Sequence, residues 1–307
     1  MSLNVSALNN FNNEIAGQML VRAVYEGQTM NYVTIKEGVK HQEPINLFDV
    51  DLVVQSGTCV STASGSMIAT QRNITVTPRT SYDGLCLKDL DTKYLGISAL
   101  NRGSYNETFA LANAYSEMLV NQFMKNNDVW LWGDRSGSSS PGLGFFTSGS
   151  NTGVIAPASI TGSAFTSTNA LTVIDTLIEN LNADVADRED LTVFMSVANF
   201  RKYTVALRTL NNFYFDPGSI SNRTGVLSML YPFNPNITVV GTAGLVNSDR
   251  VALMPAKYTV VGTDLLSDFS EFQLWYDINS DQLKHRIATK LGVQVAYPEY
   301  IVTNNRN

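Results

Sequence analysis

The residues with the greatest capacity for chemistry lie in one loop and one short acidic pattern. Residues 133–146, GDRSGSSSPGLGFF, are rich in glycine and serine, as are loops that bind phosphate through backbone N–H groups. A P-loop needs Lys followed by Ser or Thr after its last glycine, at the head of a helix, but here Gly142-Leu143-Gly144 leads into two phenylalanines. We therefore interpret this segment as a connecting turn whose glycines supply backbone freedom.

Asp49 and Asp51 form the acidic pattern. They are two residues apart in a segment that alternates like a strand, so both carboxylates would point to the same side. Such a pair could act as general acid and base. We favour the exposed face of a strand instead, because nothing else in the segment resembles a pocket.

No other combination of residues predicts an enzyme or a metal site. The sequence has no GxSxG motif, and its two histidines and two cysteines share no metal-ligand spacing, so the cysteines are expected to be free thiols. His285 alternates with Lys284 and Arg286, which predicts a surface or interface position. The acidic run at 184–190 lacks the ligand pattern of a calcium loop. We expect no catalytic residues, no metal and no cofactor.

Composition sets further limits on the function. The chain has 307 residues, 44% of them hydrophobic and 16% charged, as in a globular protein with a substantial core. Its formal net charge of -6 predicts that any contact with DNA is weak and non-specific. No apolar run is long enough to span a membrane, and residues 1–15 do not resemble a signal peptide. We therefore expect synthesis in the cytoplasm and no membrane partner.

The first part of the chain contains segments that need a neighbour to become ordered. Residues 1–15 carry five asparagines and little apolar periodicity, which indicates an arm. Apolar and polar residues alternate in 45–55, and residues 68–77 form a second such run, so the two segments predict a two-stranded ribbon. A ribbon of two strands is marginally stable in water, so we expect it to lie on a neighbour.

The later segments alternate between helices and strands, which predicts an α+β fold. A capping box, S-Y-N-E, begins at Ser104 and starts a long helix over 104–130. The elements expected after it are a helix over 167–184, a strand over 191–195, a helix capped by Ser196, and strands from Ile237 to the end.

The order of these segments resembles the major capsid protein of tailed bacteriophages, the Hong Kong 97 type of shell subunit, over nearly the whole chain. In that family an arm, an extended two-stranded loop, a spine helix and a glycine-rich turn precede an axial domain, and late strands return to a peripheral domain. The ending KLGVQVAYPEYIV resembles the family's closing strand. QSGTCVSTASGS, followed by QRNITV and GLCLKDL, is most similar to capsid proteins of crAss-like and related Bacteroidetes phages.

The resemblance implies a phage major-capsid fold and an assembly function. The implied parts are an N-terminal arm (1–44), an extended loop (45–80), a peripheral domain (81–150 and 282–307) with a spine helix (104–130), and an axial domain (151–281). The chain would self-assemble into hexamers and pentamers of an icosahedral capsid around double-stranded DNA. Expected partners are further copies, scaffolding, portal and head-decoration proteins, and packaged DNA held by non-specific contact. The protein would be made in the host bacterial cytoplasm and lie in the virion capsid.

Two strand faces of opposite charge are the candidate contacts between subunits. The ribbon carries Asp49 and Asp51, and the segment 282–302 has a basic face. We predict that the acidic face of one copy meets the basic face of the next. The candidate contact residues are Asp49, Asp51, Arg72, Lys284, Arg286 and Lys290.

Two alternatives to the phage capsid remain open. An encapsulin-type compartment would share the fold but would hold a cargo enzyme in place of DNA. A hydrolase or a surface adhesin that uses the late strands belongs to another class, and it would be a monomer.

Overall fold

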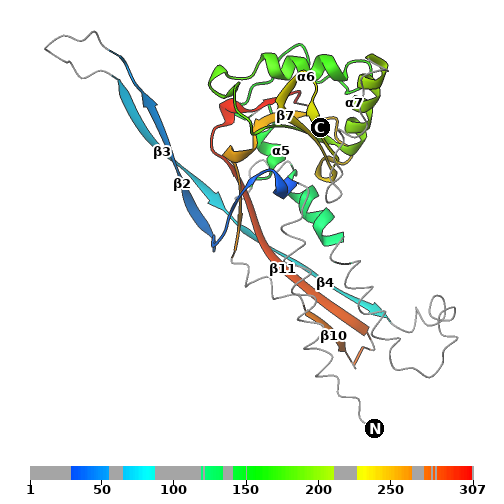
Figure 1. Cartoon of the computed structure of the whole chain (residues 1–307). Helices are drawn as coiled ribbons and strands as arrows, with labels where there is room; N and C mark the ends of the chain where they lie inside the picture. Colours follow the sequence, from blue (N-terminus) through cyan, green and yellow to red (C-terminus); the bar gives the residue numbers. More distant parts are fainter. Residues whose placement is uncertain are drawn as a thin grey trace.

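The computed structural model describes residues 29–54, 65–86, 119, 122–133, 141–149, 151–210, 227–264, 273–277, 279–280 and 282–305. Within these residues the chain forms two five-stranded sheets and a separate two-stranded ribbon (Figure 1). We call the sheet that contains β5 the compact sheet, the sheet that contains β11 the long sheet, and the two together the body.

The compact sheet has the strand order β12-β8-β5-β7-β6. Its strands are β5 (Leu191–Ser196), β6 (Leu227–Tyr231), β7 (Asn234–Thr242), β8 (Ala252–Pro255) and β12 (Val302–Thr303). The β5–β7 pair is parallel and the other pairs are antiparallel. Every residue of β5 is buried, which shows that this central strand is covered on both faces.

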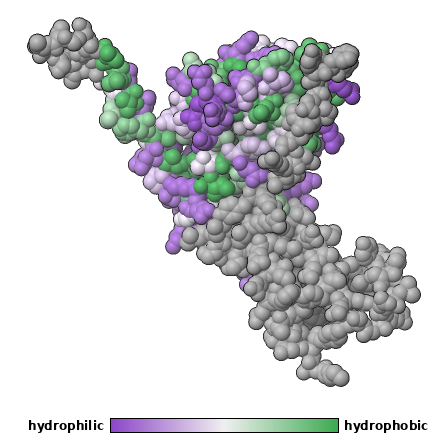
Figure 2. Space-filling view, viewed as in Figure 1, coloured by the Kyte–Doolittle hydropathy of each residue, from purple (hydrophilic) through white to green (hydrophobic). Residues whose placement is uncertain are grey.

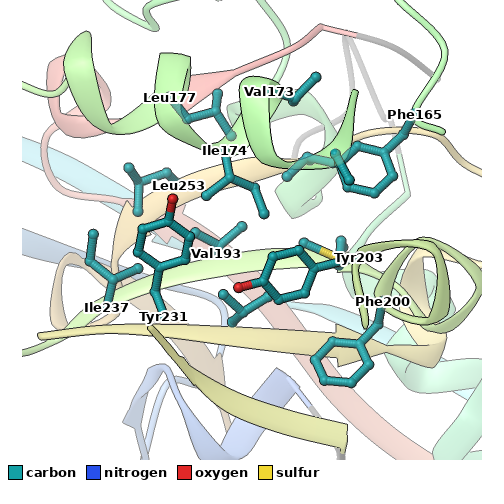
Figure 3. Packing of buried hydrophobic residues seen from close by; sticks show 14 of the residues in the cluster. Phe165, Val173, Ile174, Leu177, Val193, Phe200, Tyr203, Tyr231, Ile237 and Leu253 are labelled. Carbon is teal, nitrogen blue, oxygen red and sulfur yellow. The ribbon is translucent and has the colours of Figure 1, made fainter. Parts of the chain in front are cut away.

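Helices α6 (Ala170–Glu179) and α7 (Val197–Leu210) pack with one face of the compact sheet (Figures 1 and 3). Val193 of β5 lies in their hydrophobic cluster, whereas the next residue, Phe194, lies in the cluster on the opposite face. The predicted cap of α7 is confirmed, because the backbone N–H of Asn199 donates to Ser196 Oγ over 3.1 Å. Leu210, the last residue of this helix, is exposed.

The long sheet has the order β1-β9-β11-β10, and β4 pairs with the other side of β11. Its strands are β1 (Thr34–Lys36), β4 (Thr77–Cys86), β9 (Thr259–Thr263), β10 (Gln273–Asp277) and β11 (Gln282–Val295). Strand β11 pairs with β4 and β10 along its first part and with β9 along its last part. It therefore runs through the middle of the long sheet toward the compact sheet (Figure 1).

The ribbon consists of β2 (Gln42–Asp51) and β3 (Ser66–Thr75), as the alternation predicted. The two strands are antiparallel, from Gln42 opposite Thr75 to Asp51 opposite Ser66. The root of the ribbon packs into a small hydrophobic cluster, and the outer part extends away from the body (Figure 1). The cluster contains Val39, Ile74, Val76 and Val260, with Ile45 packed against it.

The predicted spine helix is confirmed where the structure describes it. Residues 122–131 are helical, and Phe123 and Leu131 share a hydrophobic cluster with Ile287 and Leu291 of β11. The helix therefore lies on the apolar face of the long sheet. The capping box at Ser104 lies outside the described residues.

The end of the glycine-rich loop differs from the expected flexible turn. Residues Leu143–Phe146 form α5, a one-turn helix whose Leu143 and Phe146 are buried in the same cluster as the spine helix. Gly142, which precedes α5, has an ordinary φ of -89°. A Cβ at Gly142 would lie 2.3 Å from the carbonyl oxygen of Gly133, so this glycine is needed for close packing rather than for backbone freedom. Residues 134–140 lie outside the described part.

His285 is buried, which corrects the prediction of a surface or interface position. Only 2% of its surface is exposed. In a strand, alternation with the outward Lys284 and Arg286 turns His285 to the opposite face, where Ile287 and Leu291 meet the helix. Desolvation by burial lowers the pKa of the His285 imidazole.

The remaining short elements are 3-10 helices that link the strands. They are η1 (Thr29–Asn31), η3 (Ala183–Val185), η6 (Ala243–Leu245), η7 (Ala256–Tyr258) and η9 (Pro298–Tyr300). Of the segment expected to be an arm, η1 and β1 lie in the body, where Met30 and Val33 are buried in the central cluster. The acidic run that begins in η3 is mostly exposed.

The spine helix is joined to the compact sheet by a buried carboxylate, that of Asp128, which is 3% exposed. Its Oδ1 accepts a hydrogen bond from Thr29 N over 3.1 Å. Its Oδ2 accepts from Thr242 Oγ1 over 2.8 Å and from Gly244 N over 3.0 Å. Trp132 Nε1 donates to Thr29 Oγ1 over 2.8 Å, one helical turn further along. We call these five residues the Asp128 junction.

The Asp128 junction leaves no space for a side chain at residue 244. A Cβ at Gly244 would lie 2.2 Å from Trp132 Cδ1 and 2.7 Å from the carbonyl oxygen of Asp128. The η6 backbone therefore rests directly on the helix. Buried polar groups are stable only when they are hydrogen-bonded, and here each carboxylate oxygen has at least one donor.

We expect Asp128→Asn to lower the free energy of unfolding by about 2–4 kcal/mol. In one orientation the amide nitrogen would face the backbone N–H of Thr29 and leave that donor without an acceptor. In the other orientation it would face the N–H of Gly244, which would keep only its hydrogen bond to Thr242 Oγ1. Urea denaturation of the full chain, followed by tryptophan fluorescence, measures this, because Trp132 lies in the junction.

Asp187→Asn is the matched control, since it makes the same charge change at an exposed carboxylate and should stay within about 0.5 kcal/mol of the parent. Equal urea midpoints for the two variants would contradict the role given to Asp128.

Candidate functional site

The outer part of the ribbon has two chemically different faces. In an antiparallel pair, residues opposite each other point to the same side. Phe48 lies opposite Ala69, and Val50 lies opposite Met67. We call this set of four residues the apolar face.

The other face carries the predicted acidic pair. Asp49 lies opposite Ile68, and Asp51 lies opposite Ser66. We call this the carboxylate face. Both aspartates are exposed, and neither side chain makes an ion pair or hydrogen bond with the residues that the structure describes. This arrangement agrees with a solvent-facing strand rather than with a pair of catalytic carboxylates.

The apolar face is strongly exposed. Phe48 is 58% exposed, Val50 52% and Met67 68%. Figure 2 shows hydrophobic residues on the surface of the projecting ribbon. A contiguous exposed apolar strip is uncommon on a protein that works alone, and it is typical of a surface that another protein covers.

Arg72 ties the ribbon to the body of its own chain. Its Nη1 donates to the carbonyl oxygen of Val295, at the end of β11, over 3.2 Å. The half-buried Arg72 side chain therefore holds the ribbon root, and a contact with another copy is not needed to explain it.

The basic face of β11 is partly neutralised within the chain. Lys284 Nζ lies 2.5 Å from Asp277 Oδ2, and Lys290 forms an ion pair with the buried Asp264. The hydrogen bond from Lys284, with further ones from Ser280 and the backbone of residue 279, lowers the pKa of Asp277 to about 2. The same contact raises the pKa of Lys284.

Arg286 is the exposed member of the basic face. It lies opposite Tyr82 of β4 on one side and Gln273 of β10 on the other. The rings of Tyr82 and Trp275 meet on this face with their centroids 6.1 Å apart. The surface around Arg286 is therefore aromatic and basic.

The structure does not bring the two predicted charged faces together within one chain. The carboxylate face lies on the outer ribbon, and the basic face lies on β11, across the molecule (Figure 1). The apolar face was visible in the sequence as alternation, but its exposure was not, because exposure depends on how far the ribbon extends from the body.

The described residues offer no alternative site for metal chemistry. They contain no group of three or more histidine, cysteine, aspartate or glutamate side chains that could hold a metal ion.

Among the helices that the structure describes, none combines the length and the apolar character needed to cross a bilayer.

No protein-family model matches the sequence, and no curated protein matches it either. Solved structures, in contrast, match almost the whole chain. The capsid of the native GTA particle matches at 11% identity with a TM-score of 0.56, covering 91% of this chain and 89% of that one.

Two phage structures match similarly. The procapsid of satellite phage P4 matches at 10% identity with a TM-score of 0.56, covering 93% of this chain and 89% of that one. The capsid of Myoviridae phage XM1 matches at 12% identity with a TM-score of 0.51, covering 90% and 91%. All three of these solved structures are capsids or procapsids. The two sheets, the spine helix and the projecting ribbon together form the α+β fold of phage major capsid proteins, the Hong Kong 97 type.

Proposed function

We propose that the protein is a structural subunit that assembles with copies of itself into hexamers and pentamers of an icosahedral capsid around double-stranded DNA. The observation that carries this proposal is the apolar face of the ribbon, on a fold that capsid subunits share. The occupant of that face is the body of a second copy. The protein would then lie in the virion capsid after synthesis in the host bacterial cytoplasm.

Burial of the apolar face supplies the free energy for this contact. Covering one large apolar side chain completely is worth about 1.5–3 kcal/mol. Three such residues on each ribbon therefore give a favourable contact. In a closed shell each subunit would take part in two of these contacts, because its own ribbon lies on one neighbour and the ribbon of another neighbour lies on its body. Closed symmetric assembly from repeated identical contacts follows the usual rule for homo-oligomers.

The finer assignments belong to the same proposal. The compact sheet with α6 and α7 would be the axial domain, and the long sheet with the spine helix would be the peripheral domain. Strands β9 and β10 pair with β11, so the peripheral domain would also take these two strands from the range 151–281. Scaffolding, portal and head-decoration proteins are the proposed partners. The motif QSGTCVSTASGS supports kinship with crAss-like phages.

Electron microscopy of the expressed full-length chain tests the proposal. We expect shells or capsomers, and a strictly monomeric protein at high concentration would contradict it. Particles from the native source should contain nuclease-protected DNA, whereas a protein cargo without DNA would favour an encapsulin-type compartment.

Met67→Ser should weaken assembly without unfolding the subunit. Met67 contributes to the apolar face and is exposed in the single chain, so its loss affects only the contact with a neighbour. We expect the subunit concentration needed for shell formation to rise about tenfold, as for a loss of about 1.4 kcal/mol. Light scattering against protein concentration measures this.

Ile68→Ser is the control for Met67→Ser. Ile68 is the next residue of β3, is 53% exposed, and points to the carboxylate face. Assembly at the same concentration for both variants would show that the apolar face does not dock.

Asp49→Lys combined with Asp51→Lys tests the predicted pairing with Lys284, Arg286 and Lys290 of a neighbour. We expect lower shell yield and a changed dependence on salt, with about 0–1 kcal/mol for each exposed pair. The effect should be smaller than that of Met67→Ser, because Lys284 and Lys290 already have partners in their own chain.

The control for the double charge reversal is Asp187→Lys with Glu189→Lys, which changes the net charge equally at exposed positions away from the ribbon. If yield and salt dependence of the Asp49/Asp51 variant equal those of this control, the pairing is wrong.

A further inference from the structure

The ribbon is attached to the body at its root through both of its strands. On β2, Lys36 Nζ donates to Pro44 O over 3.2 Å and lies 2.8 Å from Glu43 Oε1. Arg72 Nη1 donates to Val295 O over 3.2 Å, and Gln294 Nε2 donates to Asn73 O over 2.7 Å. Both contacts lie close to the hydrophobic cluster around Ile74. They hold the root but leave the outer ribbon free to change its angle.

Another hydrogen bond reaches further out along the ribbon. Tyr297 Oη donates to the carbonyl oxygen of Phe48 over 3.4 Å. Among the hydrogen bonds that join the described ribbon to the body, it is the farthest from the root. We call this contact the ribbon tether. It meets the ribbon at the residue where the apolar face begins.

The ring of Tyr297 is held by two other tyrosines. The ring centroids of Tyr297 and Tyr258 are 5.2 Å apart at 75°, and those of Tyr297 and Tyr300 are 5.4 Å apart at 42°. Tyr258 and Tyr300 also touch, with centroids 5.7 Å apart. Edge-to-face and offset contacts of this kind stabilise a ring arrangement. Three half-buried tyrosines therefore form one cluster beside the ribbon root.

An arginine fixes this tyrosine cluster to the compact sheet. The guanidinium of Arg188 lies over the Tyr258 ring, 4.5 Å from its centroid, and its Nη1 donates to Tyr258 Oη over 3.0 Å. Its Nε and Nη2 donate to the two carboxylate oxygens of Asp190 over 2.7 and 2.9 Å. Asp190 directly precedes β5, the central strand of the compact sheet.

The charges in this chain of contacts support one another. Desolvation alone would raise the pKa of Asp190, but hydrogen bonds from Arg188 and from the backbone N–H of Lys257 bring it below its usual value. The hydrogen bond to Asp190 raises the pKa of Arg188. A planar guanidinium that is both stacked and doubly hydrogen-bonded has a single orientation, so it also orients Tyr258.

We propose that Tyr297 sets the angle of the ribbon relative to the body, through a tether that the Tyr258, Tyr300, Arg188 and Asp190 side chains hold in place. The tether concerns a single chain and does not depend on assembly. Its consequence for a shell does rest on the proposed function: the ribbon angle decides where on a neighbouring copy the apolar face lands.

The weakness of the tether suits a contact that can be released. A neutral hydrogen bond as long as 3.4 Å on an exposed strand is weak, because water competes for both of its partners. A neighbouring copy that covers the apolar face can therefore displace Tyr297 without unfolding either the ribbon or the tyrosine cluster.

Spin-label distance measurements on the full chain test the tether. Cys59 and Cys86 are first replaced by serine. Ser66→Cys on the outer ribbon and Glu179→Cys on α6 then carry the labels, both at exposed positions. Labelled chains are diluted with excess unlabelled chains, so that the distance within one chain is measured whether or not shells form.

The parent should populate one narrow distance above a broad background, and Tyr297→Phe should lower the share of the narrow distance by up to about twofold, as expected for the loss of one weak hydrogen bond. Tyr300→Phe is the matched control, because it removes a hydroxyl from the same cluster that makes no hydrogen bond to the ribbon, and it should keep the narrow distance. Arg188→Lys should broaden the distribution as well, because a lysine cannot make the paired hydrogen bonds.

Identical distributions for Tyr297→Phe and Tyr300→Phe would overturn the proposal, as would a parent already as broad as Tyr297→Phe. Failure of the capsid proposal would appear separately, as a chain that shows the narrow distance but forms no shells.

Discussion

The arrangement of this fold depends on the buried carboxylate of Asp128. It belongs to the spine helix and accepts hydrogen bonds from Thr29 near the start of the described chain, from Thr242 at the end of β7, and from Gly244 of η6. A buried carboxylate is tolerated only while its donors stay in place, so it fixes all three segments at once. The helix in turn lies on the apolar face of the long sheet. One residue thus couples the two sheets through directional contacts, which apolar packing alone does not provide.

The ribbon, in contrast, has few contacts with the rest of the described chain. Its root is anchored by a small hydrophobic cluster and by side chains that bond to backbone carbonyls. Further out, the Tyr297 hydroxyl donates to the carbonyl oxygen of Phe48. Two strands with an exposed apolar face are marginal in water. The body has buried hydrophobic clusters of its own, whereas the outer ribbon leaves its apolar face exposed. The tyrosine cluster lies beside the root of the ribbon, where these two parts meet.

Local signals predicted part of this fold correctly. Strict alternation predicted β2 and β3, and a serine before an apolar stripe predicted the start of α7, because each signal is complete within a few residues. Strand β4 was not predicted, since Pro78 and Gly84 weaken its propensity and it is ordered by pairing with β11. The sequence placed His285 at the surface because its neighbours are basic, although the same alternation turns it inward. The candidate site was predicted only as charged faces, and the dominant apolar exposure on the ribbon was underestimated.

By itself, the sequence determined the class of the fold, the order of its parts and the lack of a recognisable catalytic set, since these follow from periodicity, capping and residue types along the chain. Only the tertiary structure decided which face of each strand is covered. It placed Lys284 and Lys290 beside carboxylates of their own chain, left Phe48 and Met67 in solvent, and gathered Tyr258, Tyr297 and Tyr300 around the ribbon root. The physical reason is that burial and ion pairing depend on neighbours far apart in sequence, and those neighbours are set by packing around the Asp128 junction.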